Sequence, residues 1–308
     1  MKLKLKGSVP FFTPKKLGAV FGLSLIICTV LRIYHVFSLI EPQTGFYSHT
    51  DITVPVFYAV LVFSWIFCLC GSFLSGEAID VSAENVSGKK ITGIITLLLS
   101  EGFFLDFFYC FSLSQQGTDN FGLTGEESPF AIMMRSGMMP RKAEMVLALL
   151  SCIYCFILAI MILTNKYKGQ MKIFSLVTVF WGIARLVTLF VRQISFVRVS
   201  DLFLEIASTA FLTIFFFSLC ECIGGVYRKD AIWRVFGVGL PAALTSLTVQ
   251  IPRIAAKIAD STHSGESDYI PYLFNNDYII NYVQIFAGIL IIAMFVSLMK
   301  NTVSQKDA

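Results

Sequence analysis

The stretch LRIYHVFSLIEPQTGFYSHTD, residues 31–51, combines the two features that decide the fold of this chain. Its first half ends an apolar run long enough to cross a bilayer, and it places Arg32 and His35 within that run. Its second half leaves the run through a turn-rich loop without lysine or arginine. Ionisable side chains within an apolar span are costly, and they usually face the interior of a helix bundle. The stretch therefore predicts a membrane protein with polar groups between its helices.

The composition supports this class of protein. The chain has 308 residues, of which 56% are hydrophobic and 14% charged, and its mean hydropathy is +0.74. A soluble domain has about 25% charged residues. Helices satisfy every backbone polar group in lipid, so the fold class is all-α, a polytopic transmembrane bundle. The net charge of +4 comes from lysine and arginine near the ends of the spans, and it does not indicate a nucleic-acid partner.

A bilayer core about 30 Å thick requires about 20 apolar residues of helix. Eight runs of this kind occur, within a single integral membrane domain that covers residues 1–308. The predicted spans are 17–40, 52–75, 91–112, 142–164, 172–194, 201–224, 232–255 and 277–299. Seven spans remain the alternative, in which the polar segment 232–255 is re-entrant.

The distribution of basic residues predicts the orientation. The segments on the side of the N-terminus carry roughly twice as many lysines and arginines as the opposite segments, which places both termini in the cytoplasm. The first apolar run is too long for a signal peptide and no small-residue cleavage site follows it, so it is expected to remain as a span. The predicted location is the plasma membrane.

Two spacings suggest an internal duplication. Arg32 and Arg185 are 153 positions apart, and the pair Cys68/Cys70 precedes the pair Cys220/Cys222 by 152 positions. These spacings suggest two parallel four-span halves, 17–164 and 172–299. Internal repeats of this type occur in transport folds.

Ionisable residues within the spans are the candidate ligand-binding groups. They are Arg32, His35, Glu101, Asp106, Arg185 and Glu205. One interpretation is a polar cavity in the outer half of the membrane, whose two arginines hold an anionic group. A second is a set of internal ion pairs, Arg32–Asp106 and Arg185–Glu205 or the crossed pairs, that fix the helix packing. Snorkelling of the arginines is the third.

The segment GVGLPAALTS is predicted to bend or break the seventh span, at Gly237, Gly239 and Pro241. No motif of a protease, hydrolase or phosphate-binding loop occurs, so the sequence does not predict an enzyme. The eight cysteines lie mostly within spans, where packing is their expected role, and three histidines form no metal-spaced cluster. No metal and no cofactor are predicted.

The segment LRIYHVFSLIEPQTGFYS carries an Arg-x-Tyr near the end of a span, followed by an acid-Pro-x-Thr-Gly-Phe turn. It resembles a signature of uncharacterised multi-pass membrane proteins of anaerobic Gram-positive bacteria. The resemblance implies a bacterial plasma-membrane protein and brings no known activity or substrate with it.

These observations favour two classes of function. The first is a transporter or permease-like protein for a small solute, of which an anion is one candidate, suggested by the arginines in the outer half of the membrane, the interrupted seventh span and the repeat. The second is a sensor, accessory or structural subunit that acts through a partner membrane protein, which its external loops would contact. The bilayer is the partner common to both.

Overall fold

The computed structural model describes residues 14–40, 46–74, 90–116, 138–164, 173–191, 199–224, 231–262 and 280–306. The helices in these ranges are α1 (Pro14–Tyr34), η1 (His35–Leu39), α2 (Thr53–Leu74), α4 (Lys90–Gln116), α6 (Met138–Leu163), α7 (Leu176–Val191), α8 (Val199–Gly224), α9 (Ala231–Thr262) and α11 (Tyr282–Lys306). Each of the eight predicted apolar runs overlaps with one α-helix over most of its length. The all-α bundle is therefore confirmed for the described part of the chain.

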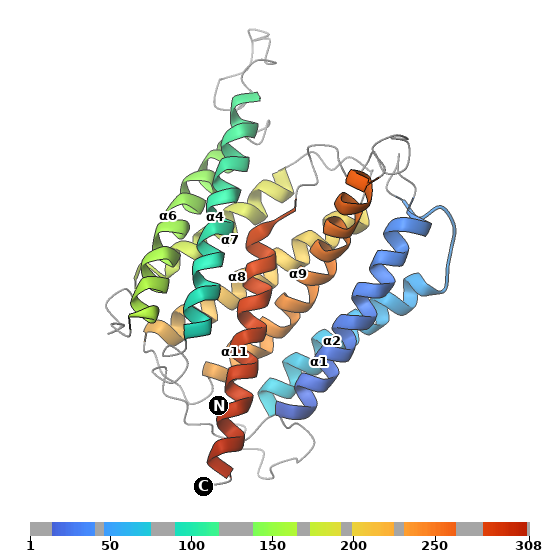
Figure 1. Cartoon of the computed structure of the whole chain (residues 1–308). Helices are drawn as coiled ribbons and strands as arrows, with labels where there is room; N and C mark the ends of the chain where they lie inside the picture. The colour runs from blue at the N-terminus through green and yellow to red at the C-terminus, as the bar shows by residue number, and fades with distance from the viewer. Residues whose placement is uncertain are drawn as a thin grey trace, which may run out of the picture.

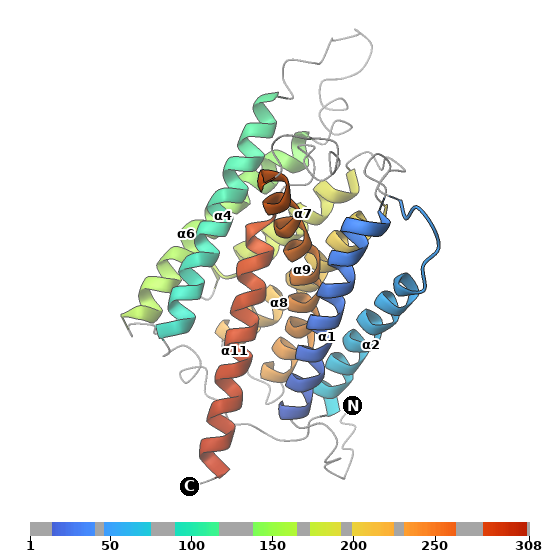
Figure 2. The ribbon, with the colours of Figure 1, turned by 45° about the vertical axis from the view of Figure 1, so that its right-hand side comes forward.

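Six of these helices are long and apolar enough to cross a membrane, namely α1, α2, α4, α6, α8 and α9. The apolar parts of α7 and α11 are shorter, Leu176–Val191 and Tyr282–Ser297. Successive helices run in opposite directions, so the start of α1 and the end of α11 lie on the same side of the bundle (Figures 1 and 2). We call this the terminal side.

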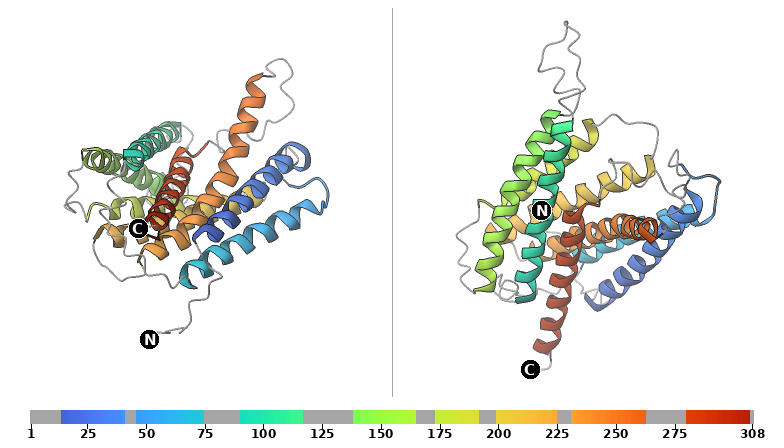
Figure 3. Two further views of the ribbon diagram at one scale, coloured as in Figure 1. Left: turned by 60° about the horizontal axis from the view of Figure 1, so that its bottom comes forward. Right: turned by 45° about the horizontal axis from the view of Figure 1, so that its top comes forward.

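The helices of the second half, together with α4 and α6, close into a ring. The helix pairs in contact around it are α4–α6, α6–α7, α7–α8, α8–α9, α9–α11 and α11–α4. Helices α1 and α2 pack on the outside of this ring, against α9, at the edge far from α4 and α6 (Figure 3). Since α7 and α8, their counterparts in the proposed repeat, lie within the ring, the duplication stays a prediction from sequence spacing.

The centre of the bundle is α9. In its most apolar stretch of 18 residues, 89% of the residues are buried, against 28% in α1. This is because α9 contacts α1, α2, α8 and α11. A helix with neighbours on every side can carry polar residues that lipid would exclude. This explains why the run least apolar in sequence is a full helix and not a re-entrant segment.

Of the predicted bend or break, the break is wrong, and the bend stays a prediction. Helix α9 continues without interruption through Gly237, Gly239 and Pro241. Proline lacks the N–H that would bond to the Gly237 carbonyl, so the helix passes this point with one backbone hydrogen bond fewer. The glycines serve close packing instead. A Cβ at Gly237 would lie 2.8 Å from Ser72 Cβ, and one at Gly239 would lie 3.0 Å from Phe215.

Gly237→Ala is therefore expected to lower the free energy of unfolding by about 1–3 kcal/mol, because α2 and α9 must move apart to admit the methyl group. Gly22→Ala in α1 is the matched control, since a Cβ at Gly22 would meet no atom within 4 Å. Alanine there is expected to be neutral or stabilising by up to about 1 kcal/mol, from helix propensity. Denaturant titration in detergent measures both. A larger loss for Gly22→Ala than for Gly237→Ala would contradict the packing argument.

The end of the first span widens into η1, a π-helical turn in which the Ile40 amide donates to the His35 carbonyl at 2.9 Å. The chain then returns, and the Ser48 amide donates to the Leu39 carbonyl at 2.8 Å. At the start of α2 the Asp51 carboxylate accepts a hydrogen bond from the Thr53 amide at 2.7 Å. This bond lowers the pKa of Asp51. These contacts hold Tyr47 beside the end of the first span.

Candidate functional site

Five ring helices each contribute one charged side chain to a single cluster inside the bundle. These residues are Asp106 of α4, Glu144 of α6, Arg185 of α7, Glu205 of α8 and Arg253 of α9. We call them the charged layer. They lie in the half of the bundle opposite the terminal side, as their distances from the helix ends require. The sequence predicts ionisable groups in this half.

Arg185 lies at the centre of the charged layer. Its Nη1 is 2.7 Å from Glu144 Oε1 and 3.9 Å from Asp106 Oδ1, and its Nη2 is 3.1 Å from Glu205 Oε1. Arg253 Nη2 is 3.2 Å from the second oxygen of Glu205. One guanidinium thus joins three helices, and Glu205 connects it to the second guanidinium.

Trp181 lies one helical turn before Arg185 on α7, so the two side chains share a face. Its indole N–H donates a hydrogen bond to Asp106 Oδ2 at 2.9 Å. The ring of Phe103 packs edge-on against the indole, with centroids 4.9 Å apart. The Asp106 carboxylate is therefore held in one orientation by a donor that carries no charge.

The formal charges within the charged layer do not cancel. Three carboxylates face two guanidinium groups, which leaves one negative charge. Glu144 is 0% exposed, and its Oε2 atom has no hydrogen-bond partner among the described residues. An uncompensated buried charge costs about 3–5 kcal/mol. The arrangement is thus electrostatically suited to a cation.

An amide and hydroxyl network continues from the charged layer along α8, α9 and α11. Gln250 donates to Gln284 Oε1 at 2.6 Å, and Gln284 donates to Thr209 Oγ1 at 3.2 Å. The backbone N–H of Asn281 donates to Gln250 Oε1 at 3.0 Å. Every helix of the ring therefore contributes a polar side chain to its interior.

A second ionic contact joins α1 to α8. Arg32 is 1% exposed and forms an ion pair and hydrogen bond with Asp201. Its other terminal nitrogen donates to the Tyr47 hydroxyl at 2.9 Å. His35 is also buried, 3.1 Å from the Thr53 hydroxyl and 3.4 Å from the Tyr47 hydroxyl. Tyr47 thus packs against the Arg32–Asp201 ion pair.

The candidate residues of the sequence divide into three groups. Asp106, Arg185 and Glu205 come together, and the Arg185–Glu205 pair is confirmed. Arg32 and His35 form the separate contact with Asp201, so the Arg32–Asp106 pair is wrong, because α1 packs outside the ring. Burial of Arg32 likewise contradicts snorkelling.

Glu101 lies on the exposed face of α4, away from the charged layer. Five residues along a helix correspond to a rotation of about 140°, which separates it from Asp106 as the spacing predicts. It is the one candidate residue that faces away from the bundle.

Sequence reasoning missed Glu144, Arg253, Asp201, Trp181 and Cys110. Glu144 and Arg253 stand near the ends of the expected spans, where charged residues usually contact water. A usable signal for Arg253 was its spacing from Ser246 and Gln250, since the three positions share one helix face. Cys110 stands four residues after Asp106, which places both on one face of α4.

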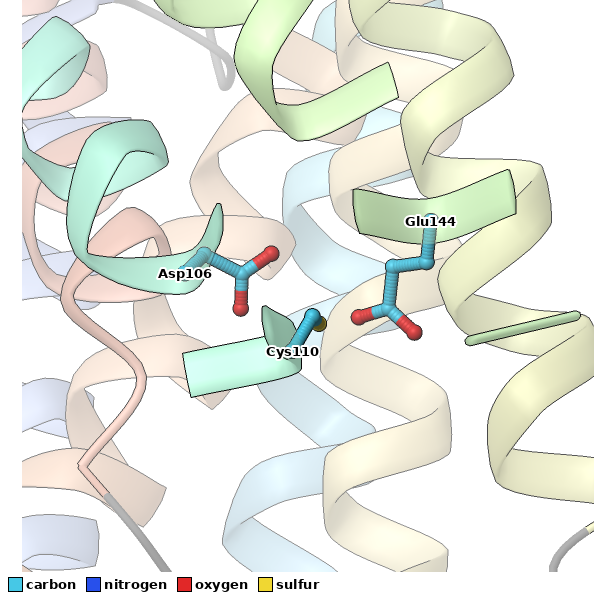
Figure 4. Close-up of side chains that lie close together, drawn as sticks. All are labelled: Asp106, Cys110 and Glu144. Atoms are coloured by element: carbon cyan, nitrogen blue, oxygen red, sulfur yellow. The ribbon is translucent and has the colours of Figure 1, made fainter. Parts of the chain in front are cut away.

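Cys110 is the only cysteine in a cluster of potential metal ligands within the described residues. The ligand atoms of Asp106, Cys110 and Glu144 all lie within 4.8 Å of one another. Figure 4 shows the three side chains turned toward a common point between α4 and α6. All eight cysteines are free thiols, and the pairs Cys68/Cys70 and Cys220/Cys222 form no such cluster in the described part of the chain.

The fold and the buried charges define a multi-pass helical membrane protein. No known protein family, curated protein or solved structure matches the chain.

Proposed function

We propose that this protein is a membrane transporter for a small cation, with the charged layer as its binding site. The observation that carries the proposal is the surplus carboxylate within the ring of six helices. Charged groups within a membrane domain are a functional hypothesis by default, because each costs about 2.5–3.5 kcal/mol to insert. Here five of them gather at one level of the bundle, on five helices.

The charges favour a cation over the anion that the sequence alone suggests. Arg185 and Arg253 are both engaged by carboxylates, and Arg32 is engaged by Asp201. An anionic solute would have to displace a carboxylate from a guanidinium. A cation meets a layer with a formal charge of −1 and an unpartnered carboxylate oxygen at Glu144.

Transport also fits the way in which the helices are held together. Arg185 of α7 is bound by carboxylates of α4, α6 and α8, and Glu205 links α8 to Arg253 of α9, so a change of partner at Arg185 would loosen several helix contacts at once. Glu144 is fully buried, so access to the layer requires neighbouring helices to separate. Alternating access by movement of one helix group against another has this requirement.

The orientation and location belong to the same proposal. The excess of basic residues on the terminal side supports cytoplasmic termini, and the charged layer then lies nearer the outer surface. The resemblance of residues 31–48 supports a bacterial plasma membrane.

A second candidate function, an accessory subunit of another membrane protein, is favoured by Glu101. A carboxylate near the middle of the span Lys90–Ser112, on an exposed and otherwise apolar helix face, suits a partner helix with a basic residue. The external loops to which the sequence assigns partner binding, 113–140 and 258–276, fall largely outside the described residues.

Cys110 reports directly on the proposed aqueous route. A variant that keeps Cys110 as its only cysteine is expected to react with a membrane-impermeant thiol reagent in intact cells, because a transported cation must reach this depth through water. Cys155 is the matched control, because both residues are 2% exposed but Cys155 packs in the apolar core. The expected labelling rate for Cys110 is at least tenfold higher.

A variant that keeps Cys70 as its only cysteine tests whether the terminal side faces the cytoplasm. Cys70 is exposed, and it should react only after the membrane is permeabilised. If neither the Cys110 variant nor the Cys155 variant is labelled, while the Cys70 variant is labelled in permeabilised membranes, the transporter is rejected. The accessory function would then stand.

A further inference from the structure

We infer that Asp106, Cys110 and Glu144 form a binding site for a divalent transition-metal ion. The role of this ion as the transported solute depends on the function proposed above. The site itself rests on geometry and charge, which can be tested separately.

The backbone brings the three ligands together. Asp106 and Cys110 are four residues apart on α4, so their side chains lie one above the other on the same face. Helix α6 packs along this face and supplies Glu144. The three ligand atoms lie within 4.8 Å of one another, and Figure 4 shows them converging. Around a tetrahedral ion with bonds of about 2.0–2.3 Å, ligand atoms are about 3.5 Å apart, so a contraction of about 1 Å completes the site.

Each carboxylate accepts a hydrogen bond through one of its oxygens. Glu144 Oε1 accepts from Arg185 and Asp106 Oδ2 accepts from Trp181. Outer contacts of this kind orient metal ligands and fix their geometry. Glu144 Oε2, by contrast, is fully buried with no hydrogen-bond partner in the described residues. This atom is an independent indication of a missing ligand, because buried polar atoms in proteins are nearly always satisfied.

The charge balance agrees with a divalent ion. The charged layer carries −1 while the Cys110 thiol is neutral. When the ion binds, the S–H bond breaks, the proton leaves to solvent and the sulfur binds the metal, with no change of oxidation state. The thiolate adds one negative charge and the ion adds two positive charges, so the occupied layer has a formal charge of zero.

The donor set indicates the class of metal. One thiolate and two carboxylates suit borderline ions such as Zn²⁺ or Co²⁺, whereas Mg²⁺ and Ca²⁺ prefer oxygen ligands alone. Three protein ligands leave the fourth position of a tetrahedral ion open to water. An open position favours exchange of the ion, which a transported solute requires.

The test uses the full-length protein purified in detergent, with Cd²⁺ as the probe, because its bond to a thiolate gives an ultraviolet charge-transfer absorption. We expect one Cd²⁺ per chain with this absorption. Cys110→Ser should abolish the absorption and weaken binding at least tenfold. Glu144→Gln keeps the thiol and should weaken binding at least tenfold. Cys155→Ser, equally buried on α6, should change neither.

The Glu144→Gln variant covers the case in which Cys110→Ser does not fold, and thermal unfolding monitors the fold of each protein. Absence of saturable Cd²⁺ binding to the unmodified chain, or binding that survives both Cys110→Ser and Glu144→Gln, would overturn the metal site. Cd²⁺ binding without labelling of Cys110 in cells would retain the site as a structural one and reject transport. Labelling of Cys110 without Cd²⁺ binding would retain transport and reject the metal.

Discussion

Arg185→Met should destabilise this protein more than any other single substitution in the charged layer, by about 3–5 kcal/mol. The guanidinium contacts Glu144 at 2.7 Å and Glu205 at 3.1 Å, and it lies near Asp106. Methionine fills much of the volume but leaves Glu144 without its hydrogen bond to Arg185, in a position that water does not reach. Denaturant titration in detergent measures the loss, and the yield of monodisperse protein should fall with it.

Two variants separate charge from geometry in this result. Arg185→Lys keeps the positive charge but loses the planar fork that bridges two carboxylates, so an intermediate loss is expected. Glu101→Gln removes a charge from the exposed face of the neighbouring helix α4 and should change the free energy of unfolding by less than about 0.5 kcal/mol. If Arg185→Met cost no more than Glu101→Gln, the charged layer would not hold the ring together.

The depth of the ionisable groups could be predicted from sequence, whereas their partners could not. A helix rises by a fixed amount per residue, so Arg32, Asp106, Arg185 and Glu205 had to lie in the half opposite the terminal side. Which of them meet depends on which helices adjoin. Because α1 packs outside the ring, Arg32 meets Asp201 on α8 and does not reach Asp106.

Glu144 and Arg253 were missed for a common physical cause. The apolar run predicts a span of 142–164, but α6 begins at Met138, and α9 extends to Thr262 beyond the predicted end at 255. Neighbouring helices supply partners to polar residues at these ends, so the helices continue where hydropathy falls. Glu144 and Arg253 are therefore interior residues, although the sequence alone suggests contact with water.

The role of Cys110 could not be predicted from the sequence for a different reason. Its spacing from Asp106 is visible in the chain, but a pair of ligands on one helix is common, and the third ligand comes from another helix. The expectation of no metal site rested on the histidines and on the Cys-x-Cys pairs. Only the packing of α6 against α4 brings Glu144 to the two residues and makes them a candidate site.

The contact between α1 and α8 should respond to paired substitution in a way that the charged layer does not. Arg32→Met and Asp201→Leu are each expected to cost about 3–5 kcal/mol, because each leaves one buried charge. The double variant removes both charges and should cost no more than either single variant, which gives a coupling energy of at least about 3 kcal/mol in a double-mutant cycle. The matched cycle of Arg185→Met with Glu205→Leu should recover little, since Glu144 still lacks a positive partner. Additive losses for Arg32 and Asp201 would contradict the pair, whereas recovery in the first cycle alone would identify it as a structural link and leave the charged layer as the functional one.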